Sequence, residues 1–414
     1  MASDAGTVAV VEPHEGTPPV IEDGNALHRA CDMLAAGTGP FAIDAERASG
    51  YRYWPRAYLL QLRREGAGTH LVDPIALAGS LGPLREVLAD AEWVLHAASQ
   101  DLPCLAELGM RPRTLFDTEL AGRLAGFPRV GLAALVAELL GYRLAKGHGA
   151  ADWSRRPLPA EWLTYAALDV EFLLPLRDAL QEVLARDGKL AWARQEFDAV
   201  RDAEPSEQHS GRIKTSKHGT EPWRRTSGIH KVRTRRGLAI VRELWQARDE
   251  LARRRDRAPG RVVPDKTIVD AALAEPRDRD ELVALPGFGG QYQRKRADFW
   301  FRHIRRAREL DERDLPEITP AGNHVPPPNK WADHNPDAAA RLAAARAALT
   351  ELAEQHTLPV ENLLLPELVR TLCWEPPEGD VEPLRAALAA GGARPWQVEL
   401  VSERLHEALG HTAS

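Results

Sequence analysis

The chain has 414 residues, of which 44% are hydrophobic and 28% are charged, and its formal net charge is −6 at pH 7. This composition excludes a fibre or a disordered tail, and the length predicts two or three domains. Three cysteines without a CxxC pair argue against a disulfide framework or a zinc knuckle. Without an apolar membrane span or a signal-peptide pattern, we expect a cytoplasmic protein with no membrane partner.

The segment 25–203, which follows an N-terminal extension over 1–24, mixes short apolar runs with helical periodicity. This pattern is typical of an α/β domain, in which helices cover a sheet. Buried strands are predicted at 40–44, 69–74 and 92–97, and helices at 77–90, 118–126 and 130–141.

A basic linker is predicted over 204–232. Between Gly211 and Arg236, nine lysines and arginines face a single acid, Glu221. Such a run is either an electrostatic surface for a phosphate-bearing partner or a solvated, flexible linker.

Two helical units follow the basic linker. Residues 233–313 are expected to form one helical domain, and the Pro-rich stretch 314–336 an extended spacer that cannot be helical. Residues 337–414 repeat the helical order of the middle domain loosely and suggest a degenerate duplication. This last unit carries twelve acids and only six arginines from Pro336 to Thr412, so we expect a structural cap rather than an RNA-binding surface.

Paired acids first appear at the end of the predicted strand 40–44. Asp44 and Glu46 in FAIDAE are two residues apart, so strand alternation places both carboxylates on one face. Carboxylate oxygens are suitable ligands for Mg²⁺ or Mn²⁺. An isolated pair of this kind is more often two solvated acids at a strand end.

A third acid, Asp101, follows the predicted strand 92–97 and opens the segment DLPCLAELG. It either caps a helix, which is the common role for an aspartate there, or points into a cleft. His96, five residues earlier, is either a core histidine or part of the same cleft.

A tyrosine and a fourth acid share one face of a predicted helix, EWLTYAALDVEFLLPLRDAL. Tyr165 and Asp169 have i, i+4 spacing and therefore project from the same side. Taken singly, this pair is an ordinary tyrosine at the core edge beside a solvated acid. Combined with the other motifs, it gives four acids on three elements that can converge on a pair of ions.

This ordered set resembles the three exonuclease motifs of the DEDD superfamily, in its tyrosine-bearing branch, and is most similar to the ribonuclease D family. The likeness rests on FAIDAE, VLHAASQDLPCL, LFDTELAGRLAG and DWSRRPLPAEWLTYAALDVEFLLPL. It continues in LWQARDELARRRDRAPGRVVPD, which resembles the helicase-and-RNase-D C-terminal (HRDC) module. The resemblance covers about 25–312, and 336–410 resemble a second HRDC unit only weakly.

The resemblance implies an α/β ribonuclease H-like exonuclease domain, with a mixed sheet and flanking helices, followed by one or two all-α HRDC-type domains. It also implies that Asp44 bridges two divalent ions, Mg²⁺ or Mn²⁺, in an in-line phosphodiester hydrolysis. Glu46 and Asp169 would complete one metal site, and Asp101 would support the second. Tyr165 would orient or deprotonate the attacking water.

The expected partner is RNA with a structured 3′ end, such as a tRNA precursor, which would be shortened to nucleoside 5′-monophosphates. Candidate substrate contacts are His96, Lys146, Arg156, Arg224, Arg225, Arg248, Arg294, Lys295 and Arg296. The arginines and lysines of the middle domain either contact phosphates or form solvated helix faces. In the loop KGHGAADW, Gly and Ala replace polar residues that are common in the family.

Two alternatives remain open from the sequence. The first is a DNA 3′–5′ exonuclease, because the metal ligands act on a phosphodiester of either nucleic acid. The second is an inactive nucleic-acid-binding or scaffold protein on a nuclease fold. Intact acids argue against the second, and the lack of a helicase P-loop or polymerase region favours a stand-alone RNA-processing enzyme.

Overall fold

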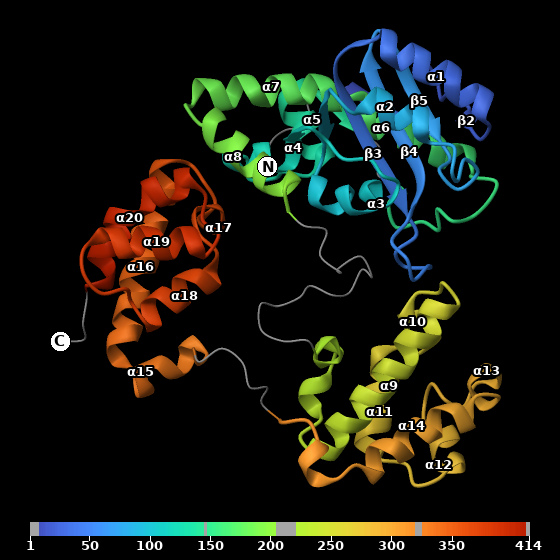
Figure 1. Ribbon diagram of the computed structural model, residues 1–414, viewed down its shortest axis with the longest axis vertical. Coiled ribbons are helices and arrows are strands. Elements are labelled where there is room, and N and C mark those ends of the chain that lie inside the picture. The colour runs from blue at the N-terminus through green and yellow to red at the C-terminus, as the bar shows by residue number, and fades with distance from the viewer. Residues whose placement is uncertain (1–7, 145–146, 204–220, 319–324, 411–414) are drawn as a thin grey trace.

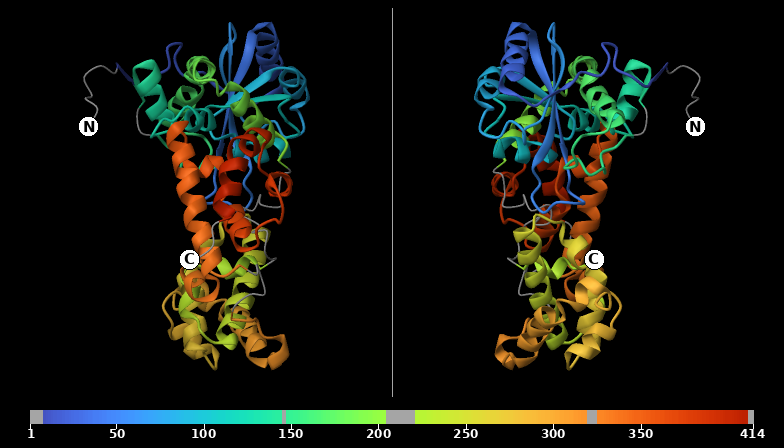
Figure 2. Two further views of the ribbon diagram at one scale, coloured as in Figure 1. Left: turned by 90° about the vertical axis from the view of Figure 1, so that its left-hand side faces the viewer. Right: turned by 90° about the vertical axis from the view of Figure 1, so that its right-hand side faces the viewer.

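Three helix-containing parts follow one another along the chain, as seen in a computed structural model that describes residues 8–144, 147–203, 221–318 and 325–410 (Figure 1). The first part contains a sheet, and the other two are helical. Along the long axis of the molecule, the middle part lies at the end away from the sheet (Figures 1 and 2).

The sheet of the first part is mixed, and among the described residues its strand order is β2-β5-β4-β3-β6-β7. Its strands are β2 (Val20–Ile21), β3 (Thr38–Arg47), β4 (Ala57–Glu65), β5 (Gly68–Val72), β6 (Glu92–Leu95) and β7 (Thr114–Asp117). β3 is central, since it pairs antiparallel with β4 and parallel with β6. A separate parallel pair joins β1 (Val8–Val10) to β8 (Tyr142–Leu144). The predicted α/β fold with a mixed sheet is confirmed.

The strand predictions were incomplete. β3, β5 and β6 were expected, but β4 and β7 were not, nor were the short strands β1, β2 and β8. The first six residues of β4 are all buried, and a strand covered on both faces lacks the polar alternation that identifies a half-buried one. β7 has four residues and leads directly into a helix, which leaves little periodic signal.

Helices cover both faces of this sheet. They are α1 (Gly24–Ala36), α2 (Gly82–Leu88), α3 (Leu102–Glu107), α4 (Thr118–Leu124), α5 (Leu132–Leu140), α6 (Ala160–Glu171), α7 (Leu173–Arg186) and α8 (Leu190–Arg201). α6 packs its Ala166 and Ala167 with Leu59 of β4. The adjacent Leu60 points to the other face of the sheet and joins the cluster that includes α1.

The middle part contains α9 (Arg235–Arg254), α10 (Pro259–Val262), α11 (Asp265–Ala274), α12 (Arg279–Ala284), α13 (Gln291–Arg294) and α14 (Ala297–Glu309). It contacts the connection between β3 and β4. The Tyr53 hydroxyl donates to Asp249 at 3.0 Å, and Arg261 donates to the Gly50 carbonyl at 2.7 Å. The buried Tyr53 side chain belongs to the core of the middle part, so this part holds the segment that directly follows β3.

The third part contains α15 (Trp331–His334), α16 (Pro336–Gln355), α17 (Val360–Leu363), α18 (Pro366–Trp374), α19 (Val381–Ala390) and α20 (Pro395–Leu409). It packs against α8 of the first part. The Trp396 indole stacks on Trp192 with ring centroids 4.8 Å apart and donates to Glu196 at 2.9 Å. Both parts share one apolar cluster, which agrees with the expected structural role of the acidic unit.

From α9 in the middle part and from α16 in the third part, the helices follow one another with similar lengths. A helix of 20 residues is followed by one of 4 residues and one of 10 residues in the middle part. The corresponding lengths in the third part are 20, 4 and 9 residues. The duplication inferred from the sequence stays a prediction, and this order of helices supports it.

Two predicted linkers are partly wrong. Residues 204–220 and 319–324 lie outside the described residues, but the rest of both segments is folded. Trp223 and Val232 are buried in the core of the middle part, as is Leu315. Trp331 is fully buried on α15, and Pro336 occupies the first turn of α16, where a missing N–H costs nothing.

None of the helices in the described ranges combines the length and the apolar content that crossing a lipid bilayer requires. The cysteines Cys31, Cys104 and Cys373 are buried free thiols.

Candidate active site

The acids of the first motif lie on the central strand β3. Asp44 and Glu46 line one cavity of about 470 Å³, and Glu46 is almost fully buried. They share a face because their positions differ by two. The strand prediction for this pair is therefore confirmed.

Helix α6 brings the third motif to the same cavity. Tyr165 and Asp169, one helical turn apart, both line it. The Tyr165 hydroxyl donates a hydrogen bond to Asp169. Ala166 and Ala167 allow α6 to lie close to the sheet, so the packing of small residues decides how near Asp169 comes to β3.

Asp101 comes to the cavity from the turn after β6. It occupies the N-terminal cap position of α3, but its side chain makes no capping hydrogen bond. Instead, an Asp101 oxygen lies 3.3 Å from an Arg47 guanidinium nitrogen. Of the two roles left open by the sequence, Asp101 therefore takes the one in the cleft.

Burial and mutual repulsion raise the pKa values of the clustered acids. Burial, followed by the charges of Asp44, Asp169 and Asp101, raises the pKa of Glu46 to about 9. Burial also raises the pKa values of Asp44, Asp101 and Asp169. Such a set of carboxylates is unfavourable without compensating positive charge.

The donor set fits a divalent cation. Asp44, Glu46 and Asp169 each offer an oxygen, and these atoms lie within 4.8 Å of one another. Oxygen ligands without thiolate favour Mg²⁺ or Mn²⁺. Gln61 lies opposite Asp44 in the register of β3 and β4, and its buried amide has no hydrogen-bond partner among the described residues.

The metal-free protein is expected to lose stability as the pH rises from about 5 to 9. Glu46 keeps its proton in the folded state over this range, whereas an unfolded glutamate with a pKa of about 4.3 does not. A divalent ion replaces that proton, so stabilisation by Mg²⁺ should grow with pH. Melting temperatures with EDTA and with Mg²⁺ across this range measure both effects. Glu46→Gln should flatten the pH dependence, and a constant effect of Mg²⁺ in the wild type would contradict the prediction.

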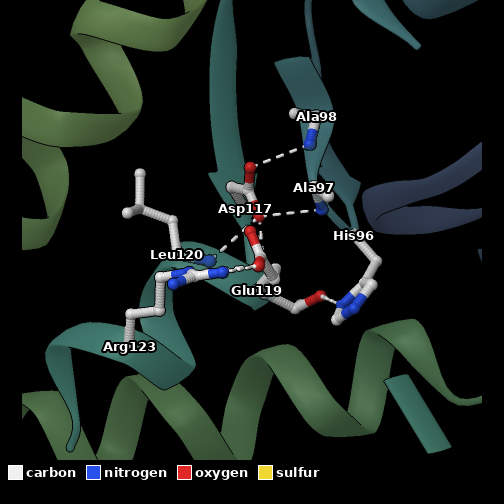
Figure 3. Close-up of polar contacts among 8 residues, drawn as sticks. His96, Ala97, Ala98, Asp117, Glu119, Leu120 and Arg123 are labelled. Carbon is white, nitrogen blue, oxygen red and sulfur yellow. Dashed lines mark hydrogen bonds and ion pairs between the residues drawn. The ribbon is translucent and has the colours of Figure 1, made fainter. Parts of the chain in front are cut away.

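A buried carboxylate, Asp117, holds the turn at Ala97 and Ala98 that follows β6 and leads to Asp101; Figure 3 shows its contacts with both alanines. One Asp117 oxygen accepts from the backbone N–H groups of Ala97, Glu119 and Leu120 at 3.0 to 3.2 Å. The other accepts from the Ala98 N–H at 2.8 Å. Asp117 thus caps α4 and also holds Ala97, whose φ of 60° is unfavourable for a residue with a side chain.

Asp117→Asn is expected to lower the free energy of unfolding by about 1–3 kcal/mol. The amide NH₂ that replaces one carboxylate oxygen cannot accept a hydrogen bond, so either the Ala98 N–H or the capping N–H groups lose their acceptor. Asp278→Asn is the matched control. Asp278 caps α12 through one oxygen, at 2.9 Å from the Glu281 nitrogen, and Asn caps about as well as Asp. Urea unfolding compares the two variants, and equal effects would contradict the double role of Asp117.

His96 lines the same cavity as a neutral imidazole. Burial lowers the pKa of His96 to about 4. Its Nδ1 lies 2.9 Å from the Thr118 hydroxyl, which itself donates to the Leu95 carbonyl. The network therefore assigns the proton to Nδ1 and leaves Nε2 as an acceptor. This nitrogen can accept a hydrogen bond from a hydroxyl group, but it has no proton to donate to a phosphate oxygen.

The loop before α6 closes on Tyr165. A Cβ atom on Gly147 would lie 1.8 Å from the Tyr165 ring, so only glycine fits there. The His148 ring meets the same tyrosine edge to face, with centroids 5.9 Å apart. The glycine in KGHGAADW therefore has a packing role beside the site.

Other predicted substrate contacts lie away from this cavity. Arg248 is 1% exposed and donates to Asp265 at 2.6 Å, so its prediction as a phosphate contact is wrong. Arg156 is bound to Asp73 at 2.6 Å and to the Tyr58 carbonyl, and Arg224 pairs with Glu221. These two arginines hold local structure. Lys146 lies outside the described residues.

The remaining basic candidates are accessible. Arg225, Arg294 and Lys295 are exposed. Arg296 lies with its guanidinium carbon 3.9 Å from the Tyr292 ring centroid. Their contacts with a substrate stay a prediction.

Sequence reasoning missed Arg47, Asp117 and Gln61. Asp117 carried a local signal, because an aspartate before a predicted helix is a capping residue. Gln61 and Arg47 carried no such signal, since their positions beside the acids depend on how β3 pairs with β4.

Family models match all three parts of the chain. Residues 18–185 match the model described as 3′–5′ exonuclease, and residues 237–304 match the HRDC domain. Residues 324–409 match the model described as 3′ to 5′ exonuclease C-terminal domain.

Curated relatives and solved structures cover most of the chain. It is 33% identical to ribonuclease D of Acidiphilium cryptum over 75% of this chain and 77% of that protein. A crystal structure of a protein from Bifidobacterium adolescentis is similar with a TM-score of 0.86 and 37% identity, over 98% of this chain and 100% of that one. The structure of Escherichia coli RNase D, described as an exoribonuclease involved in structured RNA processing, is similar with a TM-score of 0.68 and 27% identity. The match covers 94% of this chain and 98% of that chain.

Proposed function

Because this chain belongs to the ribonuclease D family of 3′–5′ exoribonucleases, we propose that it trims structured RNA at the 3′ end, as in tRNA precursors, with two Mg²⁺ or Mn²⁺ ions. The observation that carries this proposal is the convergence of Asp44, Glu46, Asp101, Asp169 and Tyr165 on one cavity. These residues come from three separate segments of the chain. Their meeting supports a common chemical role better than any single motif does.

In this mechanism Asp44, Glu46 and Asp169 hold the ions, and Asp101 supports the second one. Two bound ions supply positive charge to the attacking and the leaving oxygen of the phosphodiester. The rigid central strand and the packed helix α6 fix the ligands relative to each other, which limits the cost of positioning them for reaction.

Tyr165 orients the attacking water in this proposal. Burial, then the charge of Asp169, raises the pKa of Tyr165 above its ordinary value. The phenol therefore stays protonated at neutral pH, and its hydrogen bond to Asp169 holds it in place. A protonated hydroxyl positions a water molecule but does not remove its proton.

RNA is favoured over DNA by the chemistry of His96. Its Nε2 is left as an acceptor in the cavity, where it suits a ribose hydroxyl. The 2′-hydroxyl is the group that distinguishes RNA from DNA at a single site. We therefore assign His96 to the sugar of the terminal nucleotide. We assign the exposed Arg294, at the end of α13, and Lys295, which follows it, to the phosphates upstream.

Digestion of matched 5′-labelled RNA and DNA single strands tests the proposal. With Mg²⁺ or Mn²⁺, RNA should shorten from its 3′ end in steps of one nucleotide and release nucleoside 5′-monophosphates. EDTA should stop the reaction. Faster digestion of DNA would establish the DNA exonuclease instead, and no digestion of either strand would favour the inactive scaffold.

Structured substrates test the finer assignment. A stem with a single-stranded 3′ extension, in the form of a tRNA precursor, should be shortened down to the stem. Random internal cleavage would contradict a 3′–5′ exonuclease acting on such ends.

A further inference from the structure

Arg47 lines the cavity from the end of β3, where the pairing with β4 is irregular. Strand alternation after Glu46 would turn the Arg47 side chain to the opposite face of the sheet. The pairing of β3 with β4 shifts register between these two residues. The extra residue is Tyr58 on β4, since Glu46 pairs with Leu59 and Arg47 with Ala57. The regular ladder is disrupted at this point, and Arg47 lines the cavity together with Asp44 and Glu46.

The Arg47 guanidinium joins the turn that carries Asp101. Its Nη1 donates to the Gln100 carbonyl at 2.6 Å, and its Nη2 lies 3.3 Å from Asp101 Oδ1. The Asp101 side chain is 6% exposed, whereas that of Arg47 is 26% exposed. The arginine therefore keeps an accessible edge beside the carboxylates.

Arg47 is the only lysine or arginine among the described residues that line the cavity, where five acids face it. Its charge lowers the pKa values of Asp44, Glu46 and Asp101 against the stronger effect of burial. A phosphate group entering this acidic cavity meets one permanent cation from the chain. Guanidinium is well suited to bind phosphate with two parallel hydrogen bonds.

Asp101 lies nearer to Arg47 than to the cluster of the other three acids. The acids whose oxygens gather within 4.8 Å are Asp44, Glu46 and Asp169, and Asp101 is outside this group. Its oxygen faces Arg47 instead. An ion bound at this oxygen competes with the guanidinium, because two cations that share one carboxylate repel each other.

We propose that Arg47 exchanges partners: it neutralises Asp101 in the metal-free enzyme, and it binds a phosphate oxygen of the terminal nucleotide once Asp101 engages a divalent ion. This inference rests on the proposed function. It makes Arg47 a substrate-binding residue and also a competitor of metal binding, so removal of its charge has opposite effects on the two ligands.

The test compares Arg47→Gln with the wild type in two binding measurements that need no turnover. The probes are Mn²⁺ alone, and adenosine 5′-monophosphate in saturating Mn²⁺. Calorimetry measures the affinity of the protein for each probe. Arg47→Gln should bind Mn²⁺ about threefold or more tightly, because the competing cation is gone. It should bind the nucleotide about tenfold or more weakly, as expected for one lost charge-assisted hydrogen bond.

Arg123→Gln is the matched control for a general change in charge. Arg123 pairs with Glu119, another acid of the cavity, but does not itself line it. This variant should leave the affinity for the nucleotide within about twofold of the wild type. Arg47→Lys keeps the charge but loses the planar guanidinium with its paired N–H donors. Its affinity for the nucleotide should lie between those of the wild type and of Arg47→Gln.

The proposed exchange is overturned if Arg47→Gln lowers the affinity for both Mn²⁺ and the nucleotide, because Arg47 then only holds Asp101 in place. It is equally overturned if neither affinity changes, or if Mn²⁺ binds more tightly while the nucleotide is unaffected. Failure of the proposed function is separate from these outcomes. It would appear as wild-type protein that binds Mn²⁺ and the nucleotide but does not shorten RNA.

Discussion

Asp44→Asn is expected to lower the rate of RNA hydrolysis by at least about 10³-fold while leaving the fold intact. The amide is nearly isosteric with the carboxylate but carries no charge for the ions that Asp44 holds in the proposed mechanism. The loss of several kcal/mol of electrostatic stabilisation corresponds to this factor. Single-turnover digestion of labelled RNA measures the rate, and circular dichroism checks the fold.

Asp90→Asn is the matched control for this substitution. Asp90 is 87% exposed and pairs with the exposed Arg113 at the surface, so its change should leave the rate within about twofold. Unchanged turnover of Asp44→Asn in saturating Mg²⁺ would refute the metal-binding role of the residue. A lower melting temperature of that variant in EDTA would instead indicate damage to the fold, because removing one of the clustered acids from the metal-free protein should relieve repulsion.

Tyr165→Phe is expected to lower turnover by about 10²-fold or more with little change in RNA affinity. The ring still packs against Gly147 and His148, but the hydroxyl that donates to Asp169 is lost. Positioning of water by one side chain contributes about this factor. Measurement of kcat and KM separately distinguishes the two effects.

Tyr142→Phe provides the matched comparison, since Tyr142 packs its ring on Phe172 with centroids 5.1 Å apart and does not line the cavity. This variant should keep the wild-type kcat. If Tyr165→Phe raised KM as much as it lowered kcat, Tyr165 would be a contact for the substrate rather than for the water.

The sequence by itself determined the fold class and the set of acids. Apolar runs and helical periods identified the α/β part and the helical units, because burial of one face imposes a regular spacing. The motifs on β3 and α6 placed Asp44 with Glu46, and Tyr165 with Asp169, because both pairs depend only on the local period of a strand or a helix. These relations hold before any long-range contact forms.

Only the tertiary structure decided which other groups join these acids. Arg47 lines the cavity beside a shift of register between two strands. Asp117 holds the turn before Asp101 through Ala97, which is twenty residues away from it in the sequence. Arg248 shows the opposite outcome, since a basic residue in a charged helix is buried against Asp265. The physical reason is that the burial and ion pairing of a side chain depend on which distant segments pack against it. A local sequence pattern does not specify those segments.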